Sequence, residues 1–265
     1  MMDKKHNLSI TLFTVSSSPL PYEEKLKKIR EIGYQSIQGG LQRGMTNREH
    51  KDLLDSLGIE MSCFGGGFED IQADPEKYIE ACHYFNCDEV MIGTMPTECR
   101  YDYDGYMRAI EMMNKMGREL SKGGVWLCYH NHAQEFRRFA NGKRGIDLLY
   151  ENLDPSGVHF LLDTHWLQSG GADILEWIEK CSDRMQYLHV KDYRIAPANY
   201  NTGIGEVDKQ FAQIGSGALP WQEIIDTGLR CGVKAFIVEQ DKVYDEDPFD
   251  CAAESYRTLK ACGLY

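Results

Sequence analysis

The sequence predicts an α/β fold, a single (β/α)8 TIM barrel, and three observations lead to this class. Short apolar runs of strand length alternate eight times with amphipathic stretches of helix length, a pattern that builds parallel sheets. Proline and glycine fall where the expected helices begin and end. No linker, charge block or repeat interrupts the series, so we expect one domain over residues 1–265.

The N-terminal half contains the first four strand and helix pairs. Each expected strand is a short run bounded by polar or glycine residues, and each expected helix has apolar residues at helical spacing. Asp74 before Pro75 marks one helix start, because an acceptor side chain precedes a proline at the first helical position. The strands are expected at Leu8–Val15, Tyr34–Gln38, Glu60–Phe64 and Glu89–Gly93. The helices are expected at Glu23–Ile32, Asn47–Leu57, Pro75–Phe85 and Gly105–Lys122.

The C-terminal half repeats the pattern, and Pro220 again opens a helix. A long stretch without a pattern, Asp192–Ala218, exceeds a routine connection and is expected to form an active-site loop or lid. The strands are expected at Val125–Tyr129, Val158–Asp163, Met185–Val190 and Ala235–Glu239. The helices are expected at Gly145–Asn152, Asp173–Cys181, Trp221–Cys231 and Phe249–Ala261.

A closed barrel is favoured over an open sheet. An open doubly wound sheet would leave the first and last strands as edges. The sequence also contains no Gly-x-Gly-x-x-Gly turn to support a dinucleotide-binding fold.

Charge and composition exclude several kinds of partner. The formal net charge is −12 and the isoelectric point is near 5.1, so neither a nucleic acid nor an anionic membrane surface is expected to bind. No apolar run approaches the roughly 20 residues that span a bilayer. The nine cysteines are scattered without a C-x-x-C pair, which is typical of thiols in a reducing compartment. We expect a cytoplasmic protein with a small-molecule substrate.

Polar residues follow four of the predicted strands without an intervening turn. The carboxyl ends of barrel strands share one mouth, so these side chains are expected to line a functional site. Carboxylates converging there would repel one another, and a divalent cation would relieve the repulsion; oxygens with an imidazole suit Mn²⁺, Mg²⁺, Co²⁺ or Zn²⁺. The alternative is that the acids pair with cations at the rim, namely Lys191, Arg137, Arg138 and Arg194.

The segments at these strand ends resemble the sugar phosphate isomerase/epimerase family of xylose-isomerase-like TIM barrels. They are YHNHAQEF at Tyr129–Phe136, FLLDTHWLQSGG at Phe160–Gly171, LHVKDYR at Leu188–Arg194 and VEQD at Val238–Asp241. In the second half of the chain the resemblance rests on sequence motifs. In the first half it rests only on the order of the predicted strands and helices. It implies an enzyme acting on a sugar or polyol, in a group that includes inosose dehydratases, ketose 3-epimerases and hydroxypyruvate isomerases.

The resemblance also implies a ligand set for one divalent metal ion. The family uses a Glu, an Asp, a His and a second Glu, which by motif position are Glu135, Asp163, His189 and Glu239. In the ketose epimerases the first ligand lies nearer the strand end, where this chain has His130. His130 could therefore replace Glu135 as a ligand, and His130 or His132 could join the metal or the substrate.

The family chemistry is removal of a proton next to a carbonyl, giving an enediolate that a metal stabilises. Glu135 and Glu239 come from different strands, so one could remove the proton and the other return it. We therefore expect a metal-dependent isomerase or epimerase. The alternative within enzymes is a lyase that removes a β-hydroxyl from a keto-inositol or a 3-keto sugar.

Several further side chains are candidates for substrate binding. Trp166 stands where many relatives have a histidine, and it could stack on a sugar face or simply pack. The full set of candidates is His130, His132, Trp166, Lys191 and Arg194. A basic segment could receive a substrate phosphate, although solvated loop charge is the alternative; it consists of Arg137, Arg138, Lys143 and Arg144.

Two rivals from other classes remain at this point. A metal-dependent nuclease is disfavoured by the net charge and by the few histidines before the fifth strand. A non-catalytic sugar-binding barrel is not excluded by intact ligands. At the family level a homodimer or homotetramer is expected, with aromatic residues as candidate contacts: Phe64, Phe68, Tyr101 and Tyr103.

Overall fold

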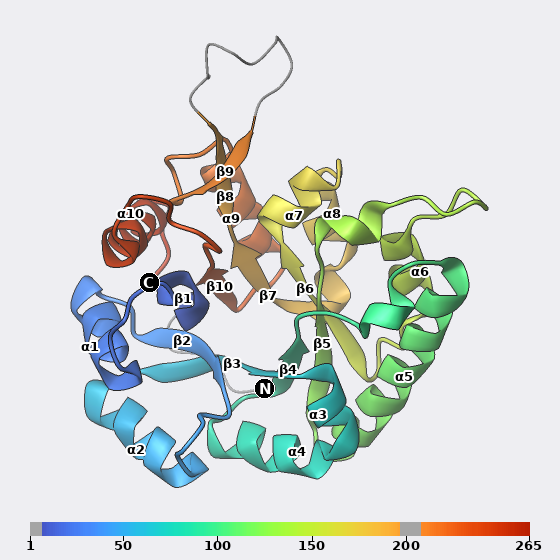
Figure 1. Ribbon diagram of the computed structural model, residues 1–265, viewed down its shortest axis with the longest axis horizontal. Helices are drawn as coiled ribbons and strands as arrows, with labels where there is room; N and C mark the ends of the chain where they lie inside the picture. The colour runs from blue at the N-terminus through green and yellow to red at the C-terminus, as the bar shows by residue number, and fades with distance from the viewer. Residues whose placement is uncertain (1–6, 197–207) are drawn as a thin grey trace.

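Eight parallel strands form a closed barrel surrounded by helices in the computed structural model, which describes residues 7–196 and 208–265 (Figure 1). The barrel strands are β1 Leu8–Thr11, β2 Ser36–Gly40, β3 Glu60–Gly66, β4 Glu89–Ile92, β5 Trp126–His130, β6 Val158–Asp163, β7 Met185–Val190 and β10 Ala235–Val238. Their order around the barrel is β1-β10-β7-β6-β5-β4-β3-β2. The predicted (β/α)8 TIM barrel is confirmed.

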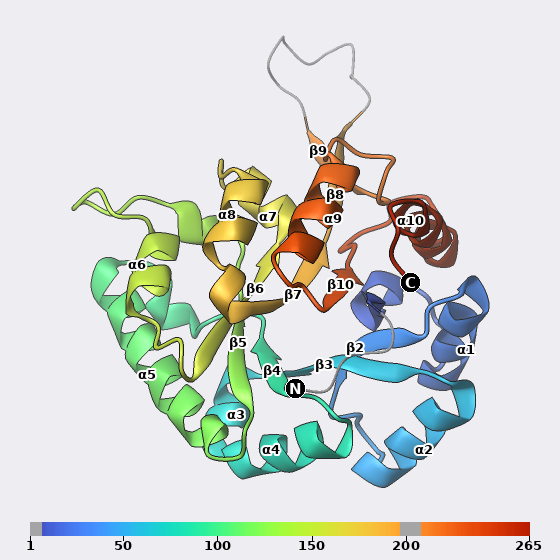
Figure 2. The same cartoon turned by 180° about the vertical axis from the view of Figure 1, so that it is seen from behind.

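The helices alternate with the strands and cover the outside of the barrel, as the view from behind also shows (Figure 2). They are α1 Tyr22–Ile32, α2 Asn47–Leu57, α3 Phe68–Ala73, α4 Pro75–Tyr84, α5 Tyr103–Ser121, α6 Gly145–Asn152, α7 Thr164–Ser169, α8 Ile174–Lys180, α9 Trp221–Arg230 and α10 Pro248–Ala261. Short 3₁₀ turns lie at η1 Leu12–Val15, η2 Thr97–Cys99, η3 Ala133–Phe136 and η4 Ser182–Arg184.

Local sequence explains where several helices begin and end. Thr46 and Glu49 form a reciprocal capping box at the start of α2, which satisfies backbone N–H groups that have no partner within the helix. Gly58 ends α2 with a φ of 64°, a left-handed conformation that glycine adopts without steric cost. Asp74 accepts a hydrogen bond from the backbone N–H of Lys77 and so caps α4, as the Asp-Pro pair predicts.

The core has two parts. One lies between the outer face of the barrel and the helices, where the apolar faces of the helices are buried. The other fills the barrel interior with a smaller cluster of fully buried residues: Cys63, Cys128, Leu161, Tyr187, Ala235 and Ile237. A filled interior leaves the carboxyl ends of the strands as the place for polar chemistry.

Three expectations need correction at the level of elements. The first strand ends at Thr11 rather than Val15, because the Thr11 side chain accepts a hydrogen bond from the N–H of Phe13 and starts the η1 turn. The short helices α3 and α7 lie where no helix is expected. Phe64 and Phe68 are buried in the core, so of the four aromatic residues offered as contacts between subunits only Tyr101 and Tyr103 are exposed.

The stretch expected to be a loop or lid, Asp192–Ala218, contains regular structure. It begins with the antiparallel pair β8 Asp192–Ile195 and β9 Lys209–Ala212. The buried carboxylate of Asp192 holds the end of the stretch, because it accepts hydrogen bonds from the indole N–H of Trp221 at 2.6 Å and the backbone N–H of Ala218 at 3.0 Å. Residues 197–207 lie outside the described residues.

Candidate metal centre

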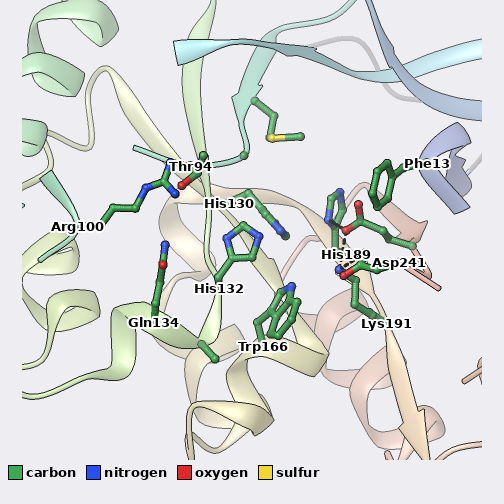
Figure 3. A pocket seen from close by; sticks show the side chains of 14 residues that line it. Phe13, Thr94, Arg100, His130, His132, Gln134, Trp166, His189, Lys191 and Asp241 are labelled. Atoms are coloured by element: carbon green, nitrogen blue, oxygen red, sulfur yellow. Dashed lines mark hydrogen bonds and ion pairs between the residues drawn. The ribbon is translucent and has the colours of Figure 1, made fainter. Parts of the chain in front are cut away.

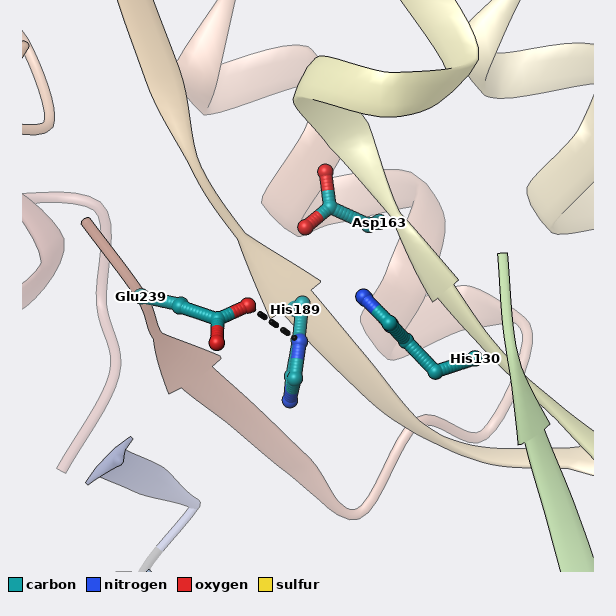
Figure 4. Close-up of side chains that lie close together, drawn as sticks. All are labelled: His130, Asp163, His189 and Glu239. Atoms are coloured by element: carbon teal, nitrogen blue, oxygen red, sulfur yellow. Dashed lines mark ion pairs between the residues drawn. The ribbon is translucent and has the colours of Figure 1, made fainter. Parts of the chain in front are cut away.

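Four potential metal ligands meet at the carboxyl ends of neighbouring strands (Figure 4). His130 ends β5, Asp163 ends β6, His189 lies in β7, and Glu239 directly follows β10. These strands are consecutive in the barrel, and Asp163 pairs in register with His189. One ligand atom from each residue lies within 4.8 Å of all the others.

The four side chains fit a divalent metal ion. Each has one buried atom without a hydrogen bond among the described residues, and these atoms are His130 Nδ1, Asp163 Oδ2, His189 Nδ1 and Glu239 Oε2. The two carboxylate oxygens do have ion-pair contacts with Lys191, which is the pairing that the alternative reading of the strand ends offers. A buried polar atom without a hydrogen bond is costly, since it has lost its water. Two carboxylates with two imidazoles form a donor set that first-row divalent ions accept.

The side chain of His189 is oriented by contacts on both ring nitrogens. Its Nε2 lies 2.6 Å from Oε1 of Gln38, which is an acceptor, so this nitrogen carries the proton. Its Nδ1 lies 2.9 Å from Oε2 of Glu239. In the neutral ring, the lone pair of Nδ1 then faces a carboxylate, and a cation held by the two residues would relieve the repulsion.

Lys191 supplies positive charge beside the cluster. Its buried ammonium lies 3.2 Å from Oδ2 of Asp163, 3.0 Å from Oε2 of Glu239 and 2.9 Å from Oδ1 of Asp241. Burial alone would lower the pKa of Lys191, but the three carboxylates together raise it. Lys191 is therefore a permanent cation in this network.

The two carboxylates of the cluster differ in acidity. Burial raises the pKa of Asp163 to about 6, although the charge of Lys191 opposes this. For Glu239, burial is outweighed by His189 and Lys191, which hold its pKa well below the usual range. Perturbed acids that share one small site are typical of functional centres.

A cavity of about 680 Å³ opens beside the cluster (Figure 3). Its wall includes His189 and Glu239 together with four of the five expected substrate contacts, His130, His132, Trp166 and Lys191. The indole N–H of Trp166 and Nδ1 of His132 have no hydrogen-bond partner among the described residues. A volume of this size accommodates a small-molecule ligand.

The structure places Glu135 apart from the other three residues of the ligand set implied by the resemblance. Its carboxylate is fully buried in η3, where it accepts hydrogen bonds from the Tyr129 hydroxyl and the His132 backbone N–H, both at 2.8 Å. Burial raises its pKa, and these donors oppose the rise. The group of four contains His130 instead, which is the alternative that the strand end offers.

The remaining predicted contacts lie outside the cavity wall. Arg194 is in β8, and its guanidinium lies 3.1 Å from Oε2 of Glu246, which corresponds to the salt-bridge alternative. Two residues of the basic segment form ion pairs with other side chains: Arg144 pairs with Asp147, and Lys143 pairs with Glu151. Neither pair lines the cavity.

Other cavity residues were not singled out as site residues from the sequence. They are Phe13, Met91, Gly93, Thr94, Arg100, Ala133, Gln134 and Asp241. Asp241 could have been found, because it closes the VEQD motif two residues after Glu239. Arg100 and Thr94 follow the fourth strand, where the sequence has no recognisable motif, so only the folded chain shows their position.

The chain belongs to the xylose isomerase-like TIM barrel family, whose model matches residues 26–262. An inosose dehydratase from Geobacillus kaustophilus is 26% identical over 201 residues, which cover 65% of this chain and 62% of that protein. Two further inosose dehydratases, from Geobacillus thermodenitrificans and Bacillus licheniformis, match over 54% and 47% of their own lengths. The chain thus spans about half to three fifths of these relatives.

Solved structures agree with the fold. A sugar phosphate isomerase/epimerase from Parabacteroides distasonis has a TM-score of 0.79 at 20% identity, with coverage of 98% of this chain and 95% of that one. An L-ribulose 3-epimerase has a TM-score of 0.67 at 16% identity, with coverage of 96% and 93%. Among the described residues, no helix combines the length and apolar character that a membrane span requires.

Proposed function

We propose that this protein is a divalent-metal-dependent enzyme that isomerises or epimerises a sugar or polyol by removing a proton next to a carbonyl. The observation that carries the proposal is the group of four side chains whose ligand atoms lie within 4.8 Å of one another, beside a cavity of about 680 Å³. Sugar isomerase/epimerase structures with the same fold support the substrate class. A cytoplasmic location, one domain over residues 1–265 and a homodimer or homotetramer remain predictions.

We assign the metal to His130, Asp163, His189 and Glu239, with Glu135 as a residue that shapes the η3 turn. A divalent ion held there would act as a Lewis acid on a carbonyl oxygen and so make the neighbouring carbon more acidic. Gln38 would keep the His189 ring turned so that Nδ1 faces the ion. Lys191 would offset carboxylate charge that the ion leaves unbalanced.

For the proton transfers we propose Glu239 and His132. Both line the cavity, whereas Glu135 does not, so His132 takes the role that the resemblance suggests for Glu135. Burial, and then the charge of Lys191, lowers the pKa of His132 to about 4, so its imidazole is neutral near pH 7. A neutral ring has a lone pair for a proton, but at this pKa it is a weak base, so the transfer would depend on a bound metal making the carbon more acidic. Trp166 would cover one face of the substrate and offer its indole N–H to a hydroxyl.

A lyase is the second candidate, favoured by the matches to inosose dehydratases. Removal of the same proton, followed by loss of a β-hydroxyl, gives dehydration instead of epimerisation. The two reactions would use the same base and the same metal. The metal ligands therefore do not distinguish them, but their products do.

The test combines metal content with proton exchange. Bound metal is measured in wild type, Asp163→Asn and Glu239→Gln, with Asp147→Asn as the control because Asp147 pairs with Arg144 outside the cavity. We expect about one ion per chain in wild type and control and a loss in the two variants. Metal-loaded wild type is then incubated in D₂O with ketoses and keto-inositols and followed by NMR.

The products discriminate the candidates. Deuterium next to a carbonyl in an isomer of the substrate supports the isomerase or epimerase, and a product lacking one water identifies the lyase. A protein that binds no divalent ion and exchanges no proton would contradict the proposal. That result would leave a non-catalytic sugar-binding barrel.

A further inference from the structure

The charges around the cavity are unevenly distributed (Figure 3). His189, Lys191 and Asp241 lie on one side, whereas Arg100 lies on the other, near Thr94 and Gln134. The ammonium of Lys191 is already within 3.2 Å of three carboxylates. Among the described residues, no carboxylate lies within ion-pair distance of Arg100, so its charge is not neutralised by the protein.

Arg100 is held in place by the loop around it. Its Nε donates a hydrogen bond to the carbonyl of Met95 at 2.8 Å. The guanidinium of Arg137 donates to the Arg100 carbonyl at 3.0 Å and to the carbonyl of Tyr101. One edge of the Arg100 guanidinium is thus used for anchoring, and its terminal NH₂ groups have no hydrogen-bond partner among the described residues.

A half-buried, anchored guanidinium without a counter-charge is suited to an anion. Two parallel N–H donors match the oxygen spacing of a carboxylate or a phosphate, and a bond to such a group is stronger than one to a neutral hydroxyl. A cation that served only solubility would be expected to extend into solvent instead of lining a cavity. The other cations considered for a substrate phosphate do not reach this cavity, since Arg144 and Lys143 pair with Asp147 and Glu151.

We infer that the cavity takes a sugar or polyol with an anionic group, a carboxylate or a phosphate, and that Arg100 binds this group. The inference rests on the proposed function in one respect, namely that a sugar-like molecule occupies the cavity. Since Arg100 faces the cluster from the far side, the anionic group is remote from the reacting carbon. Arg100 is then a specificity-determining residue for anionic over neutral sugars.

The test is a binding measurement with three molecules that share a skeleton: D-fructose, D-fructuronate and D-fructose 6-phosphate. We expect at least one anionic member to bind wild type more tightly than D-fructose, by a factor on the order of ten to a hundred at low salt. The carboxylate and phosphate members distinguish the two kinds of anion. The preference should fall as ionic strength rises.

Variants locate the effect. Arg100→Gln should lose the preference for the anionic members, and Arg100→Lys should keep a part of it because the charge remains without the paired donors. Arg138→Gln is the matched control, since Arg138 is exposed and bonds the carbonyl of Gly142. If Arg100→Gln does not fold, Arg100→Lys and the salt dependence still decide.

Three results would overturn the inference: equal affinity for neutral and anionic members, a preference that survives in Arg100→Gln, or no binding of either anionic member at about 10 mM. Binding is read without turnover. A protein that prefers the anionic sugars but exchanges no proton would refute the proposed function alone, and proton exchange without an anion preference would refute only this inference.

Discussion

The Nε2 atom of His189 lies 2.6 Å from Oε1 of Gln38, a contact that crosses the barrel interior from β7 to β2. The two strands are not neighbours in the sheet, so the contact belongs to the side chains alone. It decides which nitrogen of His189 carries the proton and therefore which one faces the cluster. The N-terminal half of the barrel thus contributes to a centre whose proposed ligands all come from the C-terminal half.

Replacement of Gln38 by leucine should weaken metal binding. Without the acceptor, the His189 ring loses its orientation, and we expect the affinity for Mn²⁺ to fall about ten- to a hundredfold. Titration of the metal-free protein with Mn²⁺ measures this. Gln222→Leu on the exposed face of α9 is the control, and an unchanged affinity in Gln38→Leu would show that the contact does not position the ligand.

Alanine at positions 130 and 135 should separate metal binding from folding. His130→Ala is expected to lose bound metal with the fold retained. Glu135→Ala should keep the metal but lower the free energy of unfolding by about 1–3 kcal/mol, because the buried hydroxyl of Tyr129 loses its acceptor. Metal analysis and urea unfolding give the two quantities. The reverse pattern, with metal lost only in Glu135→Ala, would restore Glu135 as the ligand.

Replacement of Lys191 by methionine should make stability depend strongly on metal. The buried carboxylates of Asp163 and Glu239 would lose the ammonium that compensates them, and removal of one partner of a buried ion pair costs about 3–5 kcal/mol. A divalent ion restores part of this. We expect the rise in Tm from EDTA to Mn²⁺ to be larger in Lys191→Met than in wild type.

The control for this experiment is Lys27→Met. Lys27 also contacts two carboxylates, Glu23 and Glu24, but on the surface, where water screens the charges. Its Tm should respond to metal as wild type does. An equal response in all three proteins would mean that Lys191 does not balance the charge of the cluster.

His50 should make the fold sensitive to mild acid. It is buried in α2 against Phe85, its Nε2 lies 2.8 Å from the Tyr22 hydroxyl, and burial lowers its pKa. The unfolded chain then binds a proton at higher pH than the folded chain does. The stability that the neutral ring contributes is present above the ordinary histidine pKa of about 6.5 and is lost as pH falls through the lowered value.

Urea unfolding at about pH 7.5 and about pH 5 measures the effect. Wild type should lose more unfolding free energy over this interval than His50→Gln does. His83→Gln, at an exposed position of α4, should behave as wild type does. An equal loss in wild type and His50→Gln would exclude His50 as the cause.

The barrel could be predicted because each unit carries its own local signals. The expected bounds of α2, α6, β6 and β7 agree with the structure, since capping residues and buried apolar runs lie in the same few positions. The β8 and β9 pair was missed for the opposite reason. It is stabilised by the Asp192 carboxylate through contacts up to 29 residues away, which no short pattern contains.

The candidate site could be predicted in part. Asp163, His189 and Glu239 follow strands directly, so their position at the mouth is a consequence of strand direction. Asn131, His132 and the first residues of η3 separate Glu135 from β5, and its buried carboxylate accepts the hydrogen bond of the Tyr129 hydroxyl. Arg100 lies at the end of a loop, where the direction of a side chain depends on packing that only the folded chain establishes.

The two carboxylate oxygens of Asp163 have different partners. Its Oδ1 accepts the backbone N–H of Trp166 at 2.9 Å and so caps α7, while its Oδ2 faces Lys191 and the other ligands. One carboxylate therefore connects the centre to the helix that carries the aromatic wall of the cavity. A metal ion bound to Asp163 would therefore restrict the motion of Trp166. By the same link, a sugar stacked on Trp166 would raise the affinity for the ion, so the two binding events would be coupled through the side chain of Asp163.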